Sequence, residues 1–262
     1  MAIPGKSSDM KATEAAASTN RLEWQLAEVC DVLTETYRVK SLLLELARPL
    51  GHLPGQHVDV RLVAEDGYQA QRSYSISSAP EDKRLSLTVE RVADGEVSPY
   101  LVDELRVGDR LLLRGPIGGH FVWTSDANHP LCLIAGGAGI TPLMAMLRHR
   151  DKAPRRVPAV LVYSSRSLRD VIYRDELDAM ARRDDSLRIV HTLTREQPED
   201  WQGHRGRIDK RLLAATCLPV SQQPAIYVCG PSDFVESVSA FLVELEFDAS
   251  QIKTERFGPT RG

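Results

Sequence analysis

The sequence of 262 residues contains only four cysteines, Cys30, Cys132, Cys217 and Cys229, and no C-x-x-C pair. This spacing predicts neither a structural zinc site nor a set of iron–sulfur ligands. The seven histidines form no H-x-x-x-H or H-E-x-x-H motif. We therefore expect no resident metal, and a reducing, cytoplasmic compartment is the simplest setting for a few scattered thiols.

Long apolar runs and blocks of one charge are also missing. No run approaches the ~20 apolar residues that cross a bilayer, and the polar N-terminus lacks the apolar core of a secretion signal. The net charge is −3, with acidic and basic residues interspersed, so no basic stripe indicates a nucleic-acid surface. We expect neither a membrane nor a nucleic acid among the partners.

What the chain does contain is enough apolar sequence, 42% of residues, for two modest domains or one large one. After a polar tail at 1–20, the first half shows short alternating segments bounded by turns. About six such strands, with a helix-like insert at Pro99–Leu105, predict a small closed antiparallel barrel. The expected strands are Trp24–Val32, Tyr37–Leu46, Gln71–Ser77 and Leu85–Val92, with a turn and a strand in each of Pro54–Leu62 and Val107–Pro116.

After Pro130 the pattern changes to strands that alternate with helices, which indicates a parallel sheet with helices on both faces. The expected strands are Leu131–Ala135, Ala159–Tyr163, Leu187–His191, Ala225–Cys229 and Ile252–Phe257, and the expected helices are Pro142–Arg150, Tyr173–Arg183, Arg207–Ala215 and Ser232–Leu245. The chain is thus divided into a disordered tail (1–20), a β-barrel domain (21–126) and a Rossmann-like α/β domain (127–262).

The stretch from Leu131 to Met144 reads as strand, glycine turn and helix. Its glycines allow positive φ and close approach of a ligand, Thr141 can cap the helix, and Pro142 suits the first turn. A helix N-terminus that follows such a turn favours an anion such as a phosphate. The spacing is not G-x-G-x-x-G, so an ordinary strand-to-helix turn stays an alternative on this stretch alone. The three glycines are Gly136, Gly137 and Gly139.

Two motifs in the barrel half carry similar chemistry. In Arg72-Ser73-Tyr74-Ser75, alternation puts the cation and the ring on one face and the two hydroxyls on the other. Such a set can hold a phosphate and stack on a flat heterocycle, although on this motif alone an exposed strand face is the better explanation. Gly95-Glu96-Val97-Ser98-Pro99 is a second turn into a helix, with Ser98 as N-cap, and a plain capped helix is its alternative.

Two further motifs follow strands of the parallel sheet, whose carboxyl ends bind ligands in open α/β folds. Cys229-Gly230-Pro231 ends one strand, although a free cysteine is more often a packing residue. Ser165 and Arg166 end another, and no acidic residue occurs before Asp170. With Arg174 nearby, this favours a cofactor with a 2′-phosphate over one with a free ribose. A solvated basic helix start is the alternative.

Taken together and in this order, the motifs resemble those of the ferredoxin–NADP reductase superfamily of flavin-dependent oxidoreductases. The resemblance covers almost the whole chain after about residue 21. It implies that Arg72 binds the flavin phosphate, that Tyr74 lines the isoalloxazine and that Ser75 lies near the flavin N5. It also implies that the turn of Gly95, Val97 and Ser98 supports the flavin pyrophosphate. We add Ser73 and Val89 to the expected cofactor-binding residues.

In the second half, the resemblance assigns the nicotinamide cofactor to the loop of Gly136, Gly137, Gly139, Thr141 and Pro142. It places Cys229-Gly230-Pro231 near the nicotinamide. The closing segment Glu255–Pro259 is similar to flavohaemoglobin-type members, in which an aromatic residue, here Phe257, lies against the flavin and must move aside. Ser75, Cys229 and Phe257 are the expected catalytic residues. Ala138 departs from the family pattern, which has a hydroxyl residue there.

The implied activity is hydride transfer from C4 of NADPH to N5 of bound FAD. NADH and FMN are the alternatives. Because neither a ferredoxin nor a globin domain accompanies these motifs, the resemblance implies a separate acceptor protein: a ferredoxin, a flavodoxin or an oxygenase component. Three other functions stay open: a flavin reductase that releases reduced flavin, an electron-transfer subunit of a larger complex, and a plain two-domain nucleotide-binding protein.

Overall fold

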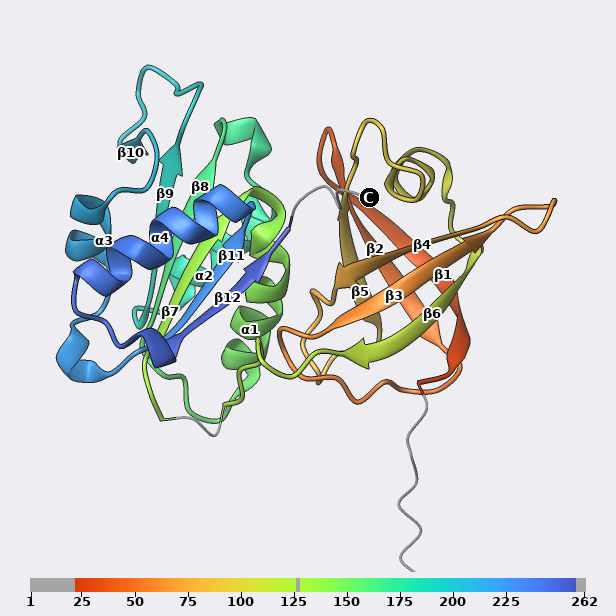
Figure 1. Cartoon of the computed structure of the whole chain (residues 1–262), viewed down its shortest axis with the longest axis horizontal. Coiled ribbons are helices and arrows are strands. Elements are labelled where there is room, and N and C mark those ends of the chain that lie inside the picture. Colours follow the sequence, from red (N-terminus) through yellow and green to blue (C-terminus); the bar gives the residue numbers. More distant parts are fainter. Residues whose placement is uncertain (1–21, 126–127, 258–262) are drawn as a thin grey trace, which may run out of the picture.

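The computed structural model describes residues 22–125 and 128–257, so the expected tail at 1–20 lies outside the described residues. Figure 1 shows two sheets side by side, each belonging to one half of the chain. This arrangement confirms the predicted barrel followed by an α/β domain. No helix in the described ranges is both long and apolar enough to cross a membrane.

The first half forms a six-stranded antiparallel sheet in the order β4-β3-β6-β1-β2-β5. The two outermost strands meet through a bridge between Ile76 and Leu87 and a hydrogen bond from Ser77 N to Ser86 O of 2.8 Å, which close the barrel. A short helical turn, η1 (Tyr100–Glu104), lies at the expected insert. The strands are β1 (Trp24–Thr36), β2 (Val39–Leu46), β3 (His57–Val63), β4 (Gln69–Ser75), β5 (Leu85–Glu90) and β6 (Arg110–Ile117).

The second half forms a parallel sheet in the order β10-β9-β8-β7-β11-β12. Its strands are β7 (Leu131–Gly136), β8 (Ala159–Ser165), β9 (Leu187–Leu193), β10 (His204–Arg205), β11 (Ala225–Gly230) and β12 (Ile252–Arg256). The strand order reverses between β7 and β11, which is the switch point where such folds bind ligands. The glycine loop after Leu131–Gly136 therefore lies at the carboxyl edge of the sheet, where a phosphate-binding loop is expected.

Four α-helices cover the two faces of this sheet: α1 (Ile140–Lys152), α2 (Arg174–Arg183), α3 (Lys210–Thr216) and α4 (Ser232–Glu244). One apolar cluster packs α1 and α2 on one face, and another packs α3 and α4 on the other. The sequence places the start of α3 too early, at Arg207. The helix begins after Asp209, whose carboxylate accepts a hydrogen bond from Leu212 N at 2.7 Å. The sequence also misses the two-residue strand β10.

The two domains are joined by a buried polar network around Thr88 of β5. The Thr88 hydroxyl lies 2.8 Å from that of Ser41 in the barrel and 2.5 Å from that of Tyr173, which immediately precedes α2. The Tyr173 N–H also donates to Glu35 at 3.3 Å. Tyr173 has φ of 58°, a strained value for a bulky residue, and bonds to the opposite domain hold it there.

A second link between the domains runs from α1 to the residues just beyond β4. Arg148 donates to the carbonyl of Ser77 at 2.8 Å and makes two hydrogen bonds to Glu176, at 2.9 and 2.7 Å. Its guanidinium also lies over the ring of Tyr173, 5.0 Å from the centroid. Arg148 therefore joins the chain just beyond β4 to α1, which carries it, and to α2, which carries Glu176.

The first prediction concerns this network. Tyr173→Phe removes one buried hydroxyl and leaves Thr88 short of a partner, so the free energy of unfolding in urea should fall by about 1–2 kcal/mol. Tyr37→Phe, at a residue 72% exposed in the β1–β2 turn, is the matched control and should leave the free energy within about 0.5 kcal/mol. Equal stability of the two variants would show that the network does not hold the domains together.

Candidate functional site

The glycine loop after β7 packs directly on the end of β11. A Cβ added to Gly139 would lie 2.1 Å from the carbonyl oxygen of Cys229, so only glycine fits there. Gly137 has φ of +55° and faces open space, which leaves room for a ligand against the backbone. Two motifs that lie 90 residues apart in the sequence thus form one wall of a site.

The helix that follows does not begin as the sequence suggests. Thr141 was expected to cap it, but α1 begins at Ile140, and its N-cap position is Gly139, without a side-chain bond. Thr141 lies inside the first turn, as does Pro142. The Thr141 hydroxyl is buried and has no hydrogen-bond partner within the described residues. The first N–H groups of the helix and this hydroxyl are left for a polar ligand.

On the barrel side, the register of β3 and β4 agrees with the expected alternation. Tyr74 pairs with Val58 and Arg72 with Val60, so the two side chains share one face of β4. Tyr74 packs against the barrel core, and burial raises its pKa, whereas Arg72 is exposed. Ser73 is on the opposite face and donates to Asp59 at 2.7 Å. Ser75 is buried, and its hydroxyl has no partner among the described residues. Only Ser75 of the two serines therefore has a hydroxyl free for a ligand.

The Gly95 turn is closed by its own serine. Ser98 accepts a hydrogen bond from Val92 N at 3.0 Å instead of capping η1, which corrects the expected N-cap role. A Cβ on Gly95 would lie 2.9 Å from the Ser98 hydroxyl oxygen. Val97 is fully buried in the barrel core, as is Val89, so neither side chain is accessible to a ligand. These two residues are left with backbone contacts alone.

Arg72 is exposed at the edge of β4. One end of its guanidinium donates to the Gln71 carbonyl at 2.7 Å, and the other to the Glu96 carboxylate at 3.1 Å. Glu96 in turn accepts from the Tyr68 hydroxyl at 2.6 Å. The Gly95 turn and Arg72, both expected around the flavin phosphates, are therefore in direct contact.

The carboxyl end of β11 also meets β12. Phe257 N donates to Gly230 O at 2.9 Å, and the half-buried Phe257 ring packs against the core beneath α1 and α2. Gly258 and Pro259 lie outside the described residues. Cys229 is completely buried, and burial raises the pKa of its thiol, so it is a neutral packing residue in this state. Pro231 is exposed and immediately precedes α4.

Glu255 is a residue that the sequence analysis quotes but assigns no role. It pairs in register with Cys229, and its Oε2 atom is buried without a partner in the described chain. Burial raises the pKa of the Glu255 carboxyl to about 7. A sequence signal for Glu255 does exist: it is an acidic residue near the end of the last strand, β12, whose partner strand ends at Cys229-Gly230.

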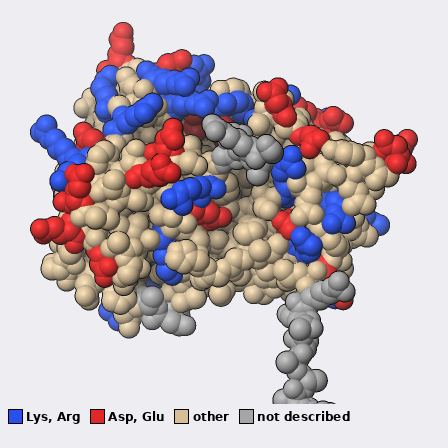
Figure 2. Space-filling model, in the orientation of Figure 1, with Lys and Arg blue, Asp and Glu red and all other residues tan. Residues whose placement is uncertain are grey.

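Farther along the same carboxyl edge of the sheet, the backbones of the loops after β8 and β9 are hydrogen-bonded to each other. Arg195 N donates to Arg166 O at 2.8 Å, and Thr194 N donates to Ser165 O at 2.9 Å. Arg166 and Arg195 are both exposed, and Figure 2 shows Lys and Arg side chains gathered over this end of the domain. The Ser165 hydroxyl is buried without a partner in the described residues. Arg195 carries no motif of its own in the sequence, because only the pairing of β8 with β9 brings it beside Arg166.

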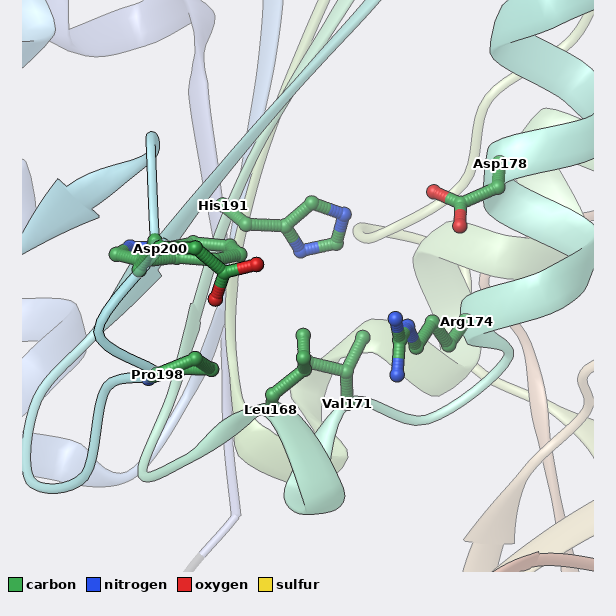
Figure 3. A pocket seen from close by; sticks show the side chains of 8 residues that line it. Leu168, Val171, Arg174, Asp178, His191, Pro198 and Asp200 are labelled. Atoms are coloured by element: carbon green, nitrogen blue, oxygen red, sulfur yellow. The ribbon is translucent and has the colours of Figure 1, made fainter.

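Arg174 lines a cavity of about 260 Å³ (Figure 3). Arg174 and Asp178 reach into it from α2, His191 from β9, and Trp201 from the loop beyond β9. Burial lowers the pKa of His191, so its imidazole is neutral at pH 7. The structure brings Arg166 next to Arg195, and the expected role of Arg174 at a 2′-phosphate stays a prediction.

The polar atoms left unpartnered fit two cofactors better than a metal. Ser75, Thr141, Ser165 and Glu255 each bury an oxygen without a hydrogen bond in the described residues, and such orphans are rare unless a ligand or water satisfies them. All four belong to the expected flavin and nicotinamide segments or end beside them. In the same ranges, no three His, Cys, Asp or Glu side chains form a metal-binding group.

Two family models match the chain. Residues 24–123 match an oxidoreductase FAD-binding domain, and residues 133–240 match an oxidoreductase NAD-binding domain. Together they cover both observed domains. These matches confirm FAD and a nicotinamide dinucleotide as the cofactors.

Curated relatives extend the likeness over most of the chain. It is 36% identical over 243 residues to the glycine betaine monooxygenase reductase subunit of Pseudomonas aeruginosa, a match that covers 90% of this chain and 64% of that protein. It is 32% identical over 248 residues to the ferredoxin reductase component of 3-ketosteroid-9-alpha-monooxygenase of Mycobacterium tuberculosis, with 90% and 65% covered. The chain thus spans slightly less than two thirds of these relatives.

Solved structures share the fold. The FAD/NAD-binding domain of a nitric oxide dioxygenase from Vibrio cholerae superimposes with a TM-score of 0.79 at 26% identity, over 90% of this chain and 99% of that one. A ferredoxin–NADP+ reductase from Neisseria gonorrhoeae, with FAD and NADP bound, superimposes with a TM-score of 0.73 at 20% identity, covering 89% and 98%.

The second prediction uses the raised pKa of Glu255. Its neutral form is favoured in the folded state, so wild-type stability should decrease as the pH rises from 4.5 towards about 7, where the folded protein loses this proton. Glu255→Gln keeps a neutral side chain at every pH. In urea unfolding, the variant should gain on the order of 1–3 kcal/mol relative to wild type between pH 5 and pH 8.

Glu244→Gln, at a residue whose carboxylate forms an exposed pair with Lys210, is the control for removal of one acidic charge. It should show no such gain over this pH range. A difference between Glu255→Gln and wild type that does not change with pH would contradict the raised pKa.

Proposed function

Since this chain belongs to the oxidoreductase family that pairs FAD- and NAD-binding domains in the ferredoxin–NADP reductase fold, we propose that it is an NADPH-dependent reductase. It takes electrons from NADPH through FAD and passes them to a separate redox protein. The observation that carries this proposal is the contact of Arg148 with Ser77 O, because it ties the end of the R-x-Y-S strand to the helix that begins at the glycine loop.

An oxygenase component is the acceptor that the relatives support. The two relatives described above are reductase components of monooxygenases, by their names, and the chain matches about two thirds of each. A ferredoxin or a flavodoxin is the other acceptor within the proposal. The cytoplasm is the proposed compartment, in keeping with four free thiols, of which Cys132 donates a hydrogen bond to Cys217 at 3.4 Å without forming a disulfide.

When bound, the two cofactors supply hydride transfer between nicotinamide and flavin, and the protein supplies position and charge. Arg72 provides a cation for the flavin phosphates, and the free hydroxyls of Ser75 and Thr141 provide hydrogen bonds from opposite domains. Glu255 can hold or release a proton at Oε2 near neutral pH, because burial raises its pKa to about 7. Phe257, anchored through its N–H to Gly230, is the aromatic residue proposed to lie against the flavin.

The preference for NADPH rests on Arg166 and Arg195. Their backbones are hydrogen-bonded to each other at the carboxyl edge, both side chains are exposed, and neither forms an ion pair within the described ranges. By contrast, the neighbouring Arg169 is paired with Glu196 at 2.7 Å. Two exposed arginines without ion pairs, on loops joined by a backbone hydrogen bond, suit the dianionic 2′-phosphate of NADPH and offer a free ribose hydroxyl nothing specific.

A direct experiment tests the function. The purified chain should show flavin absorbance, and extraction and mass measurement should identify FAD. It should oxidise NADPH rapidly with ferricyanide as the acceptor, and faster than NADH at equal low concentration. A chain that binds no flavin even after FAD is added would rule out the reductase. Flavin that is lost on gel filtration would favour the alternative of a flavin reductase that releases its product.

The third prediction tests the arginine pair. Arg166→Ala and Arg195→Ala should each raise KM for NADPH roughly tenfold, the loss expected for one charged hydrogen bond of about 1.4 kcal/mol, and leave KM for NADH nearly unchanged. Arg182→Ala, an exposed arginine in the last turn of α2, is the matched control and should change neither value. Equal increases for both nucleotides would refute the 2′-phosphate assignment.

A further inference from the structure

Arg72 is not free in this structure, although it is the cation expected at the flavin phosphates. Its guanidinium donates to Glu96 at 3.1 Å, and the Tyr68 hydroxyl donates to the other oxygen of the same carboxylate at 2.6 Å. Tyr68 belongs to the β3–β4 turn, whereas Glu96 belongs to the turn before η1. The turn into β4, β4 itself and the turn before η1 therefore meet at one exposed ion pair.

The backbone that carries Glu96 has little room to move away. Val92 N is hydrogen-bonded to the Ser98 hydroxyl at 3.0 Å, and Gly95 N donates to Val92 O at 3.1 Å, so the turn is closed on itself. Val97, next to Glu96, is fully buried in the barrel core and anchors the turn from below. A ligand that needs the Arg72 guanidinium must therefore displace the Glu96 side chain by rotation about its own bonds.

We propose that Glu96 competes with the FAD pyrophosphate for Arg72 and thereby weakens FAD binding. A carboxylate and a phosphate bind the same donor edge of the guanidinium, so the two anions compete for it. This inference rests on the proposed flavin site, and it adds an internal determinant of how readily the cofactor exchanges.

The size of the effect follows from exposure. The Arg72 and Glu96 side chains are 47% and 50% exposed, so their pair is that of a surface ion pair, which contributes up to about 1 kcal/mol. Loss of the competitor should therefore strengthen FAD binding by about two- to fivefold. Because the pair is exposed, salt should weaken both the competitor and the FAD phosphate contact.

The experiment measures the affinity of the full chain for FAD after its own flavin has been removed. Quenching of flavin fluorescence during titration gives Kd for wild type, for Glu96→Gln and for the control Asp94→Asn. Asp94 is an exposed acidic residue of the same turn with no contact to Arg72. Glu96→Gln should lower Kd for FAD about two- to fivefold, and Asp94→Asn should not change it.

Two further arms locate the effect. Riboflavin lacks phosphate, so its Kd should be the same for wild type and Glu96→Gln. In an Arg72→Ala background, Glu96→Gln should change Kd for FAD by less than twofold, because the contested group is gone. An unchanged or raised Kd for FAD in Glu96→Gln alone would overturn the proposal. Wild-type protein that does not bind FAD at all would instead overturn the proposed function, which keeps the two failures distinct.

Discussion

The site depends on how the two domains are held together, and a small polar network does this. Tyr173 places its hydroxyl on Thr88 and its N–H on Glu35, both in the barrel, while its own backbone is in a left-handed conformation that a bulky residue avoids. Such strain persists only where the surroundings over-determine it. Arg148 adds a second tie, from α1 to Ser77. Without these bonds, the flavin strand and the glycine loop would be two half-sites on separate bodies.

Hydrogen-bond accounting separates ligand-directed polar groups from structural ones. Ser73 and Ser98 carry hydroxyls that the protein already satisfies, through Asp59 and Val92 N. Ser75, Thr141 and Ser165 are just as polar and as short, yet their buried oxygens have no partner in the described chain. A buried unpaired polar group costs about 1–3 kcal/mol, so these three hydroxyls are available to the proposed cofactors. Ser239 in α4 also has an unpartnered hydroxyl in the described residues, so the assignment depends on position in the fold as well.

The two ends of the proposed cofactor path differ in how their cations are kept. Arg166 and Arg195 are exposed and unpaired within the described ranges, so a phosphate can reach them without displacing another group. Arg72 is held by Glu96, so a phosphate must replace a carboxylate there. A diffusing substrate such as NADPH must bind and leave in every cycle, whereas a resident cofactor binds once. Arginine is thus proposed to bind a phosphate at both places, but its carboxylate partner Glu96 must be displaced only at Arg72.

Much of this protein could be read from the sequence, because local patterns determine local structure. Period-two alternation predicted the barrel strands, the glycine turns predicted the loops at the switch point, and the order of five short motifs predicted the family and both cofactors. The errors were the ends of some elements and the two-residue strand β10, which is too short to have a pattern of its own. Thr141 and Ser98 look like helix caps in the sequence. In the structure, Gly139 takes the N-cap position of α1, and the Ser98 hydroxyl accepts a hydrogen bond from Val92 N.

What only the tertiary structure decided are contacts between residues far apart in the chain. Glu255 acquires a pKa of about 7 because strand pairing buries it beside Cys229, and no local pattern encodes that burial. Arg195 joins Arg166 through the pairing of β8 with β9, and Glu96 reaches Arg72 across 24 residues. Sequence patterns specify which side chains are present and which face they take, whereas burial and partners depend on how the sheets close and pack.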